Sequence, residues 1–172
     1  RALEKYPDGV KGIGATPEGL ETCPILYDLL FELPWMRREE GKDWVDRYSQ
    51  ARYGVKSEAM ERGWHLLTQS VLNCPNPSQD VEAVICARPA LDVRRVSGWG
   101  TCQIFHDIRM VRKAAEQMLR ERERLQGNPN YEHDIADVVR QTLTDSTYYL
   151  LKDIAASYKS GKMEAFRKQY TT

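Results

Sequence analysis

The sequence predicts an all-α domain that follows one short β-strand. From residue 22 almost to the end, apolar residues recur at the spacing of helical faces. Residues that start or stop helices, such as Ser57, Asp107 and Gly161, stand between these stretches. The single convincing strand, 10–14, has no second strand in this sequence to pair with. We therefore expect the chain to be a piece of a longer protein, with that strand paired outside it or frayed.

Three helices are predicted in the first half of the chain, over 22–33, 42–54 and 57–73. Pro34 ends the first of them, because proline lacks the N–H that a helix interior needs. Gly54 ends the second by adopting a left-handed conformation. Ser57 is a favourable N-cap for the third, which has acidic residues in its first turns.

The second half is predicted to hold an irregular segment and three further helices. Residues 74–105 show few helical repeats but many apolar side chains, which favours an ordered, packed loop. Asp107 caps a helix that ends near residue 127, and a very long helix runs from about 130 to 159. The residues expected in the core from that long helix are Ile135, Val138, Leu143, Tyr149, Leu150 and Ile154. Gly161 breaks it, and a last helix starts at 162.

The composition is that of an ordinary globular protein and argues against two classes of partner. Of the 172 residues, 25 are basic and 25 are acidic, so the formal net charge is zero. A general nucleic-acid binder needs a surplus of Lys and Arg to neutralise phosphates, so we expect no nucleic-acid partner. No apolar run approaches the roughly 20 residues that cross a bilayer, so we expect no membrane partner. The chain starts without a secretory leader, and we expect any targeting signal to lie outside it.

The four cysteines do not have the spacing of a metal site. No two of them form a C-x-x-C pair, so a zinc site is not predicted, and no other cofactor is expected. Cys74 and Cys86 flank a proline-rich loop, and a disulfide between them is one interpretation. The other is four separate thiols, most of them buried.

A lone carboxylate, Glu18, stands between Pro17 and Gly19 where the strand gives way to the first helix. A phosphate loop is disfavoured, because the spacing is not G-x-G-x-x-G and a carboxylate repels phosphate. Glu18 could simply complement the positive end of the helix. It could also be catalytic, because residues at the carboxyl ends of barrel strands face the active site, and glycosidases use a pair of carboxylates. The residues alone leave these last two interpretations open.

An ordered series of motifs resembles glycoside hydrolase family 89, the α-N-acetylglucosaminidases. The run GIGATPEGLETCPILYDLLFELPW is similar to the last barrel strand and helix of that family. The stretches WVDRYSQARYG, WHLLTQSVLNC, ARPAL and IFHDIRMV follow in the order of the family. The resemblance covers nearly the whole chain, and the series is more specific than any one of its motifs.

The resemblance implies a fold in two parts. Residues 1–35 would be a remnant of a (β/α)8 barrel, one strand and one helix, and residues 36–172 an all-helical C-terminal domain that is cut off at its end. The parent protein would be an exo-acting, retaining glycosidase that releases non-reducing terminal α-linked N-acetylglucosamine from glycans. Glu18 would be its nucleophile. The acid/base glutamate would lie on an earlier barrel strand outside this chain, so the fragment alone would be inactive.

The resemblance also assigns substrate-binding residues to the helical domain. The segment 88–107 is expected to form one wall of the sugar pocket and to pack, with the rest of the domain, against the barrel of the parent chain. Phe105 matches an aromatic residue beside that pocket, and His106 stands where tyrosine is common. Trp99 and Tyr27 are further candidates, each with a structural interpretation beside the functional one.

The alternative function is a helical interaction or scaffold domain without chemistry. In that case Glu18 would be only a charge at the start of a helix. A carbohydrate enzyme of this type is usually exported, to a bacterial periplasm or cell envelope, or lysosomal, and we expect one of these locations.

Overall fold

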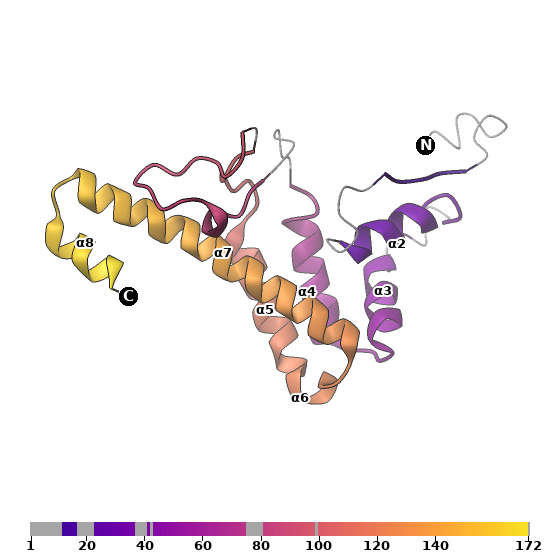
Figure 1. Cartoon of the computed structure of the whole chain (residues 1–172). Coiled ribbons are helices and arrows are strands. Elements are labelled where there is room, and N and C mark those ends of the chain that lie inside the picture. Colours follow the sequence, from indigo (N-terminus) through magenta and orange to yellow (C-terminus); the bar gives the residue numbers. More distant parts are fainter. Residues whose placement is uncertain are drawn as a thin grey trace.

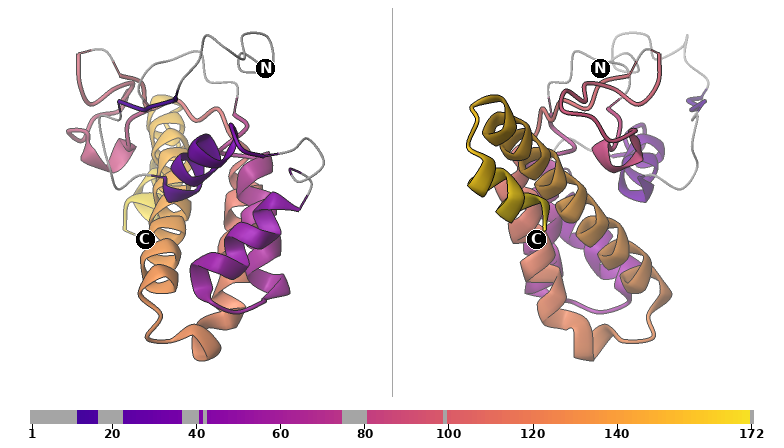
Figure 2. Two further views of the ribbon diagram at one scale, coloured as in Figure 1. Left: turned by 90° about the vertical axis from the view of Figure 1, so that its right-hand side faces the viewer. Right: turned by 60° about the vertical axis from the view of Figure 1, so that its left-hand side comes forward.

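The computed structural model describes residues 12–16, 23–36, 41, 43–74, 81–98 and 100–171. These residues form a helical bundle from which one long helix extends (Figure 1). Helices α4 (Glu58–Gln69) and α5 (Ile108–Met118) pack against each other, and α3 (Trp44–Tyr53) packs on α4. Helix α7 (Pro129–Lys159) packs along α5 and runs on beyond the bundle to α8 (Met163–Tyr170), as Figure 2 shows.

The remaining elements are short: α2 (Pro24–Glu32), the 3-10 helices η1 (Val84–Cys86) and η2 (Leu119–Glu121), and α6 (Arg122–Leu125). The predicted all-α fold is therefore confirmed. The predicted strand is not present in the part of it that is described, since residues 12–16 are exposed and unpaired. A strand needs a neighbour for its backbone groups, and the described residues offer no ladder there. Of the expected barrel remnant, only its helix, α2, is present in the described part of the chain.

Short-range hydrogen bonds explain where the helices begin. Ser57 Oγ accepts the backbone N–H of Met60 at 3.2 Å, which caps α4 as predicted. Asp107 Oδ1 accepts the N–H of Arg109 at 2.9 Å and caps α5, also as predicted. Asn128 caps α7 by accepting two backbone N–H groups, each at 3.1 Å.

Two glycines end helices because they can adopt positive φ. Gly54 has φ 72° after α3, and Gly161 has φ 70° after α7. Both stops were predicted from the sequence. Helix α5, in contrast, ends earlier than expected, at Met118, and gives way to η2 and α6.

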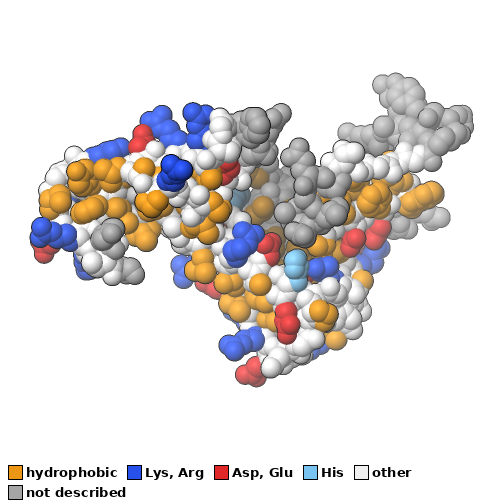
Figure 3. Space-filling view, in the orientation of Figure 1, with side chains coloured by type: hydrophobic (Ala, Val, Ile, Leu, Met, Phe, Trp, Pro, Cys, Tyr) orange, Lys and Arg blue, Asp and Glu red, His pale blue; other side chains and the backbone are white. Residues whose placement is uncertain are grey.

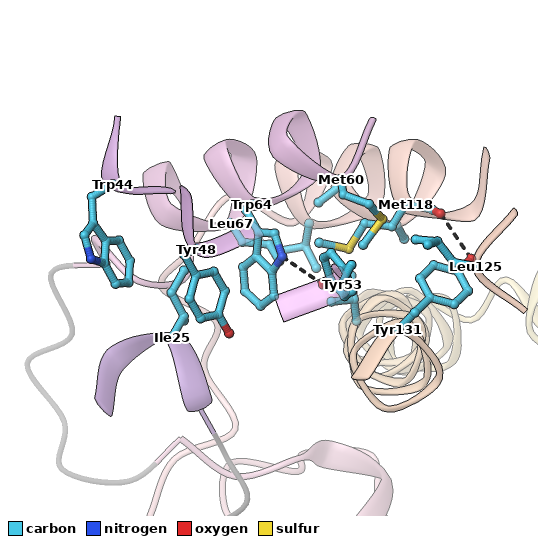
Figure 4. Close-up of a cluster of buried hydrophobic side chains, with 14 residues drawn as sticks. Ile25, Trp44, Tyr48, Tyr53, Met60, Trp64, Leu67, Met118, Leu125 and Tyr131 are labelled. Carbon is cyan, nitrogen blue, oxygen red and sulfur yellow. Dashed lines mark hydrogen bonds between the residues drawn. The ribbon is translucent and has the colours of Figure 1, made fainter. Parts of the chain in front are cut away.

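The core is unusually aromatic and lies between α2, α3, α4, α5 and α7 (Figure 4). Trp44 stacks on Tyr48 with ring centroids 5.4 Å apart, and Tyr48 meets Trp64 edge-on at 5.2 Å. Trp64 Nε1 donates to Tyr53 Oη at 2.9 Å, so the polar edge of the indole is satisfied inside the core. Ile25 of α2 is buried in the same cluster, so α2 packs with the bundle.

The buried face of α7 differs from the prediction. Leu143, Tyr149 and Leu150 were expected in the core but are exposed, whereas Val138 is buried there and Ile135 is partly buried against it. The inward side chains recur at alternating spacings of three and four residues: Tyr131, Asp134, Val138, Gln141, Asp145 and Tyr148. Because half of these side chains are polar, an apolar pattern alone selects the wrong face.

The segment 81–105, as far as it is described, is a loop that lies over the C-terminal half of α7 (Figure 1). An isolated parallel bridge between Val81 and Thr101 closes its ends. Within it, the carboxylate of Glu82 accepts the backbone N–H groups of Val96 and Ser97, at 2.5 and 2.7 Å. A Cβ on Gly100 would lie 2.1 Å from Glu82 Cδ, so any larger residue there would force the Glu82 side chain to move. The prediction of a packed loop is confirmed only in part: Val84 and Cys102 are buried against Tyr148, whereas Ile85, Leu91 and Val96 are exposed, and residues 75–80 and 99 lie outside the described part.

The four cysteines are separate thiols, and the proposed Cys74–Cys86 pair is not formed. Only Cys102 among them is buried, so the expectation that most would be buried is wrong. Over the described part of the chain, no helix is both long and apolar enough to span a membrane. The same residues contain no cluster of His, Cys, Asp and Glu suited to a metal ion.

Candidate functional site

A cavity of about 380 Å³ lies between the loop and α7. Phe105 and His106 contribute from the segment that leads into α5, and Gln141, Thr144 and Asp145 contribute from α7. Its remaining lining is Val71, Cys74, Val81, Glu82, Ala83, Val84, Cys102, Ile104, Arg140 and Tyr148. Aromatic faces and hydrogen-bonding groups on one concave surface are what small polar ligands need.

A buried polar network forms one side of this cavity. His106 Nε2 lies 2.7 Å from Asp145 Oδ2, and Gln141 Nε2 donates to Asp145 Oδ1 at 2.8 Å. The side chains of His106 and Asp145 are only 10% and 3% exposed. Both carboxylate oxygens are therefore engaged, which orients the imidazole and fixes the segment that carries Phe105.

Two further side chains of the cavity lining, Glu82 and Cys102, have a defined protonation state. Hydrogen bonds from Ser97 and from the backbone N–H of Val96 hold the pKa of Glu82 below its ordinary value, so Glu82 stays ionised. Burial raises the pKa of the Cys102 thiol, so Cys102 stays protonated and unreactive.

A second cavity, of about 250 Å³, adjoins the first. The two share Val71, Arg140 and Gln141 as lining residues. The second cavity is also lined by Cys23 and Pro24, the residues where the described chain resumes before α2. The start of α2 is thus placed next to the cavity that contains Phe105 and His106.

The structure brings together two of the five predicted site residues. Phe105 and His106 share the first cavity, whereas Tyr27 is half-buried on α2 and lines neither cavity. Glu18 and Trp99 lie outside the described residues. Whether Phe105 and His106 contact a sugar remains a prediction.

Gln141, Thr144 and Asp145 were not singled out in the sequence. Their spacing carries a signal, because Gln141 and Asp145 continue the three-and-four repeat that places Tyr131, Asp134 and Val138 inward. Polar residues on an inward face point to a buried network or a site rather than to a plain core.

Comparison with known proteins decides the family. The model of the alpha-N-acetylglucosaminidase (NAGLU) C-terminal domain matches residues 44–172, most of the chain. The chain belongs to this family. The resemblance inferred from the ordered motifs is confirmed.

Alpha-N-acetylglucosaminidase from Homo sapiens is 27% identical to the chain over 180 residues. The match covers 96% of this chain but 23% of the human protein, so the chain spans less than a quarter of that relative.

Solved structures give the same result. One is a glycoside hydrolase of family 89 from Clostridium perfringens in which two glutamates are replaced by glutamine, in complex with its substrate GlcNAc-alpha-1,4-galactose. It superposes with a TM-score of 0.85 at 27% identity, over 96% of this chain and 19% of that protein. A second, the family 89 enzyme bound to 2-acetamido-1,2-dideoxynojirimycin, has a TM-score of 0.86 at 27% identity, over 98% of this chain and 19% of that protein.

Proposed function

We propose that this chain is part of an exo-acting, retaining glycosidase that releases terminal α-linked N-acetylglucosamine, with Glu18 as its nucleophile. The main support is the similarity of nearly the whole chain to a glycosidase solved with such a substrate bound. Residues 1–35 would then complete the catalytic barrel, and residues 36–172 would form the helical domain that packs on it.

The described residues support the position of Glu18 through chain length. Glu18 is five residues before Cys23, which lines the second cavity. Five residues span at most about 17 Å, so Glu18 would lie within that distance of Cys23 and of the second cavity, which shares lining residues with the cavity of Phe105 and His106.

The chemistry assigned to Glu18 is that of a retaining enzyme. Its carboxylate would attack the anomeric carbon, form a glycosyl-enzyme ester and be released by water. A second carboxyl, about 5 Å away, would protonate the leaving oxygen and then activate the water. We assign that group to a part of the parent protein outside this chain, and we expect the isolated chain to be inactive.

Phe105 and His106 would contribute recognition rather than bond cleavage. An aromatic face suits the C–H side of a pyranose, and Phe105 is half-buried on the cavity wall. Both carboxylates of the described cavity already hold protein groups, since Glu82 binds backbone N–H groups and Asp145 binds His106 and Gln141. Neither is therefore our candidate for the nucleophile.

The rest of the parent chain would cover an apolar surface of the long helices. Hydrophobic side chains gather over the C-terminal half of α7 and over α8, on the left of Figure 3. The exposed hydrophobic residues of α7 and α8 include Leu143, Leu150, Tyr158 and Met163, each more than 40% exposed. Such a surface is typical of a contact between domains.

The test is hydrolysis of an aryl α-N-acetylglucosaminide by the full-length protein. We expect Glu18→Gln to lower kcat by at least about a thousandfold, because the covalent step is lost. Azide should restore turnover of Glu18→Ala and yield the β-glycosyl azide, since azide enters the space left on the nucleophile's face. Glu123→Gln, which changes an exposed glutamate on α6, is the matched control and should leave the rate unchanged. Near-normal turnover by Glu18→Gln would end the assignment.

A further inference from the structure

One hydroxyl on the cavity face of α7 differs from its neighbours. Thr142, Ser146 and Thr147 each donate to the backbone carbonyl four residues earlier, at 2.8 to 2.9 Å. Thr144 lies among them and is only 6% exposed, yet its Oγ1 is buried and has no hydrogen-bond partner among the described residues.

A buried hydroxyl without a partner destabilises a fold, because folding removes its hydrogen bonds to water and returns none. Thr144 lines the 380 Å³ cavity, so a bound molecule can supply the missing bond there. The nearby polar groups do not need a ligand, since Asp145 already holds His106 and Gln141. Among the described lining residues, Thr144 is thus a buried polar group whose hydrogen bond the protein itself does not supply, and it can add to the recognition that Phe105 and His106 provide.

The charges around the cavity indicate which ligands fit. Glu82 and Asp145 line the cavity as carboxylates, and Arg140, the one arginine among the described lining residues, pairs with Asp137 at 2.5 Å. An anionic ligand would meet two negative groups and no free cation within the described lining. A hydroxyl group both donates and accepts, so Thr144 matches the hydroxyl or amide group of a neutral sugar.

We propose that Thr144 is a specificity-determining residue that hydrogen-bonds a hydroxyl or acetamido group of the neutral sugar bound in this cavity. The inference rests on the proposed function, because it takes the cavity to be part of the sugar site. Asp145 acts as a positioning residue in this arrangement: it holds His106, and thereby the segment of Phe105, on the cavity that Thr144 also lines.

The experiment compares Thr144→Val and Thr144→Ser in the full-length protein. Valine has nearly the shape of threonine and lacks only the hydroxyl, whereas serine retains it. PUGNAc, the ligand of one solved relative, serves as the probe in calorimetry, beside kinetics on an aryl α-N-acetylglucosaminide.

We expect Thr144→Val to raise both Kd and KM about fivefold to tenfold, the usual effect of one neutral hydrogen bond, with kcat within about twofold. Its Tm should equal or exceed that of the wild type, because an unpartnered buried hydroxyl is removed. Thr144→Ser should bind within about twofold of the wild type. Thr147→Val, on the same helix but outside the cavity lining, is the control and should bind normally.

The outcomes separate this inference from the proposed function. If Thr144→Val binds PUGNAc like the wild type while hydrolysis still requires Glu18, only water pairs with Thr144, and this inference alone is overturned. A clear fall in Tm for Thr144→Val would also overturn it, since the hydroxyl would then have a structural partner. If the wild type neither binds PUGNAc nor depends on Glu18, the proposed function fails and this inference fails with it.

Discussion

Asp134 of α7 and Arg52 of α3 form a bidentate ion pair across 82 residues of sequence, with N–O distances of 2.5 and 2.7 Å. Tyr53 Oη donates to the same carboxylate at 2.7 Å. The Arg52 and Asp134 side chains are only 13% and 4% exposed, so the pair is buried. The hydrogen bond from Arg52 to Asp134 raises the pKa of the guanidinium, which stays charged. This pair ties α7 to the aromatic core.

Removing Asp134 should therefore destabilise the chain strongly. We expect Asp134→Ala to lower the free energy of unfolding by about 3–5 kcal/mol, because Arg52 is left buried without its counter-charge. Asp137→Ala is the control, since Asp137 pairs with Arg140 at an exposed position of the same helix and should cost no more than about 1 kcal/mol. Urea unfolding followed by circular dichroism measures both. Equal losses in the two variants would contradict a structural role for the buried pair.

The cap of α5 should make stability depend on pH in the acid range. Hydrogen bonds from the Arg109 side chain and backbone lower the pKa of Asp107 from 3.8 to about 2. A carboxyl whose pKa is depressed by folding stabilises the fold above its unfolded pKa, and that contribution disappears as pH falls through the folded value. Asp107→Ala should thus lower Tm at pH 7, and the difference from wild type should narrow between pH 4 and pH 2. A difference that stays constant down to pH 2 would show that the charge contributes nothing.

The loop over α7 should open when Gly100 gains a methyl group. A Cβ at Gly100 would overlap Glu82, so Gly100→Ala should push that carboxylate away from the N–H groups of Val96 and Ser97. We expect faster trypsin cleavage after Arg94 and Arg95 in this variant. Gly98→Ala is the matched control, because no atom lies within 4 Å of its added Cβ. Equal cleavage of the two variants would mean that Glu82 does not hold the loop.

The hydrogen bond between His106 and Asp145 should contribute more to the free energy of unfolding than a similar pair on the surface. His106→Leu leaves one oxygen of a buried carboxylate unpaired, and we expect a loss of about 1–3 kcal/mol in stability. His106→Gln should lose less, because its amide can still donate to Asp145. His65 and Asp46 form the same 2.7 Å contact at 40% and 43% exposure, so His65→Leu should cost no more than about 1 kcal/mol. Thermal unfolding of the three variants measures these losses. If His65→Leu lost the most stability, the buried pair would not be the stronger of the two.

Helix ends were the features best predicted from sequence. Ser57, Asp107, Gly54 and Gly161 act within about four residues of themselves, so their effect is visible in the linear chain. The buried face of α7 was predicted less well: Leu143 and Leu150 follow a helical apolar pattern, yet the inward positions belong to Asp134, Gln141 and Asp145. The sequence around an apolar residue does not show whether another part of the protein covers that residue.

Some residues of the candidate site were likewise predicted from the sequence, and others were found only in the structure. Ordered motifs identified the family and pointed to Phe105 and His106, which the structure places on one cavity. Asp145, which bonds His106, and Thr144, which lines the same cavity, lie almost 40 residues further along the chain, and no local pattern joins the two segments.

The sequence by itself determined the helical class, most helix limits and membership of the family, because propensities, caps and motifs act over short stretches of chain. Tertiary structure alone decided which face of α7 is buried, that Asp134 and Arg52 meet, and that the Thr144 hydroxyl lies in a cavity without a partner among the described residues. These outcomes depend on contacts between residues that are far apart in the chain. Such contacts form only when hydrophobic burial has brought the helices together.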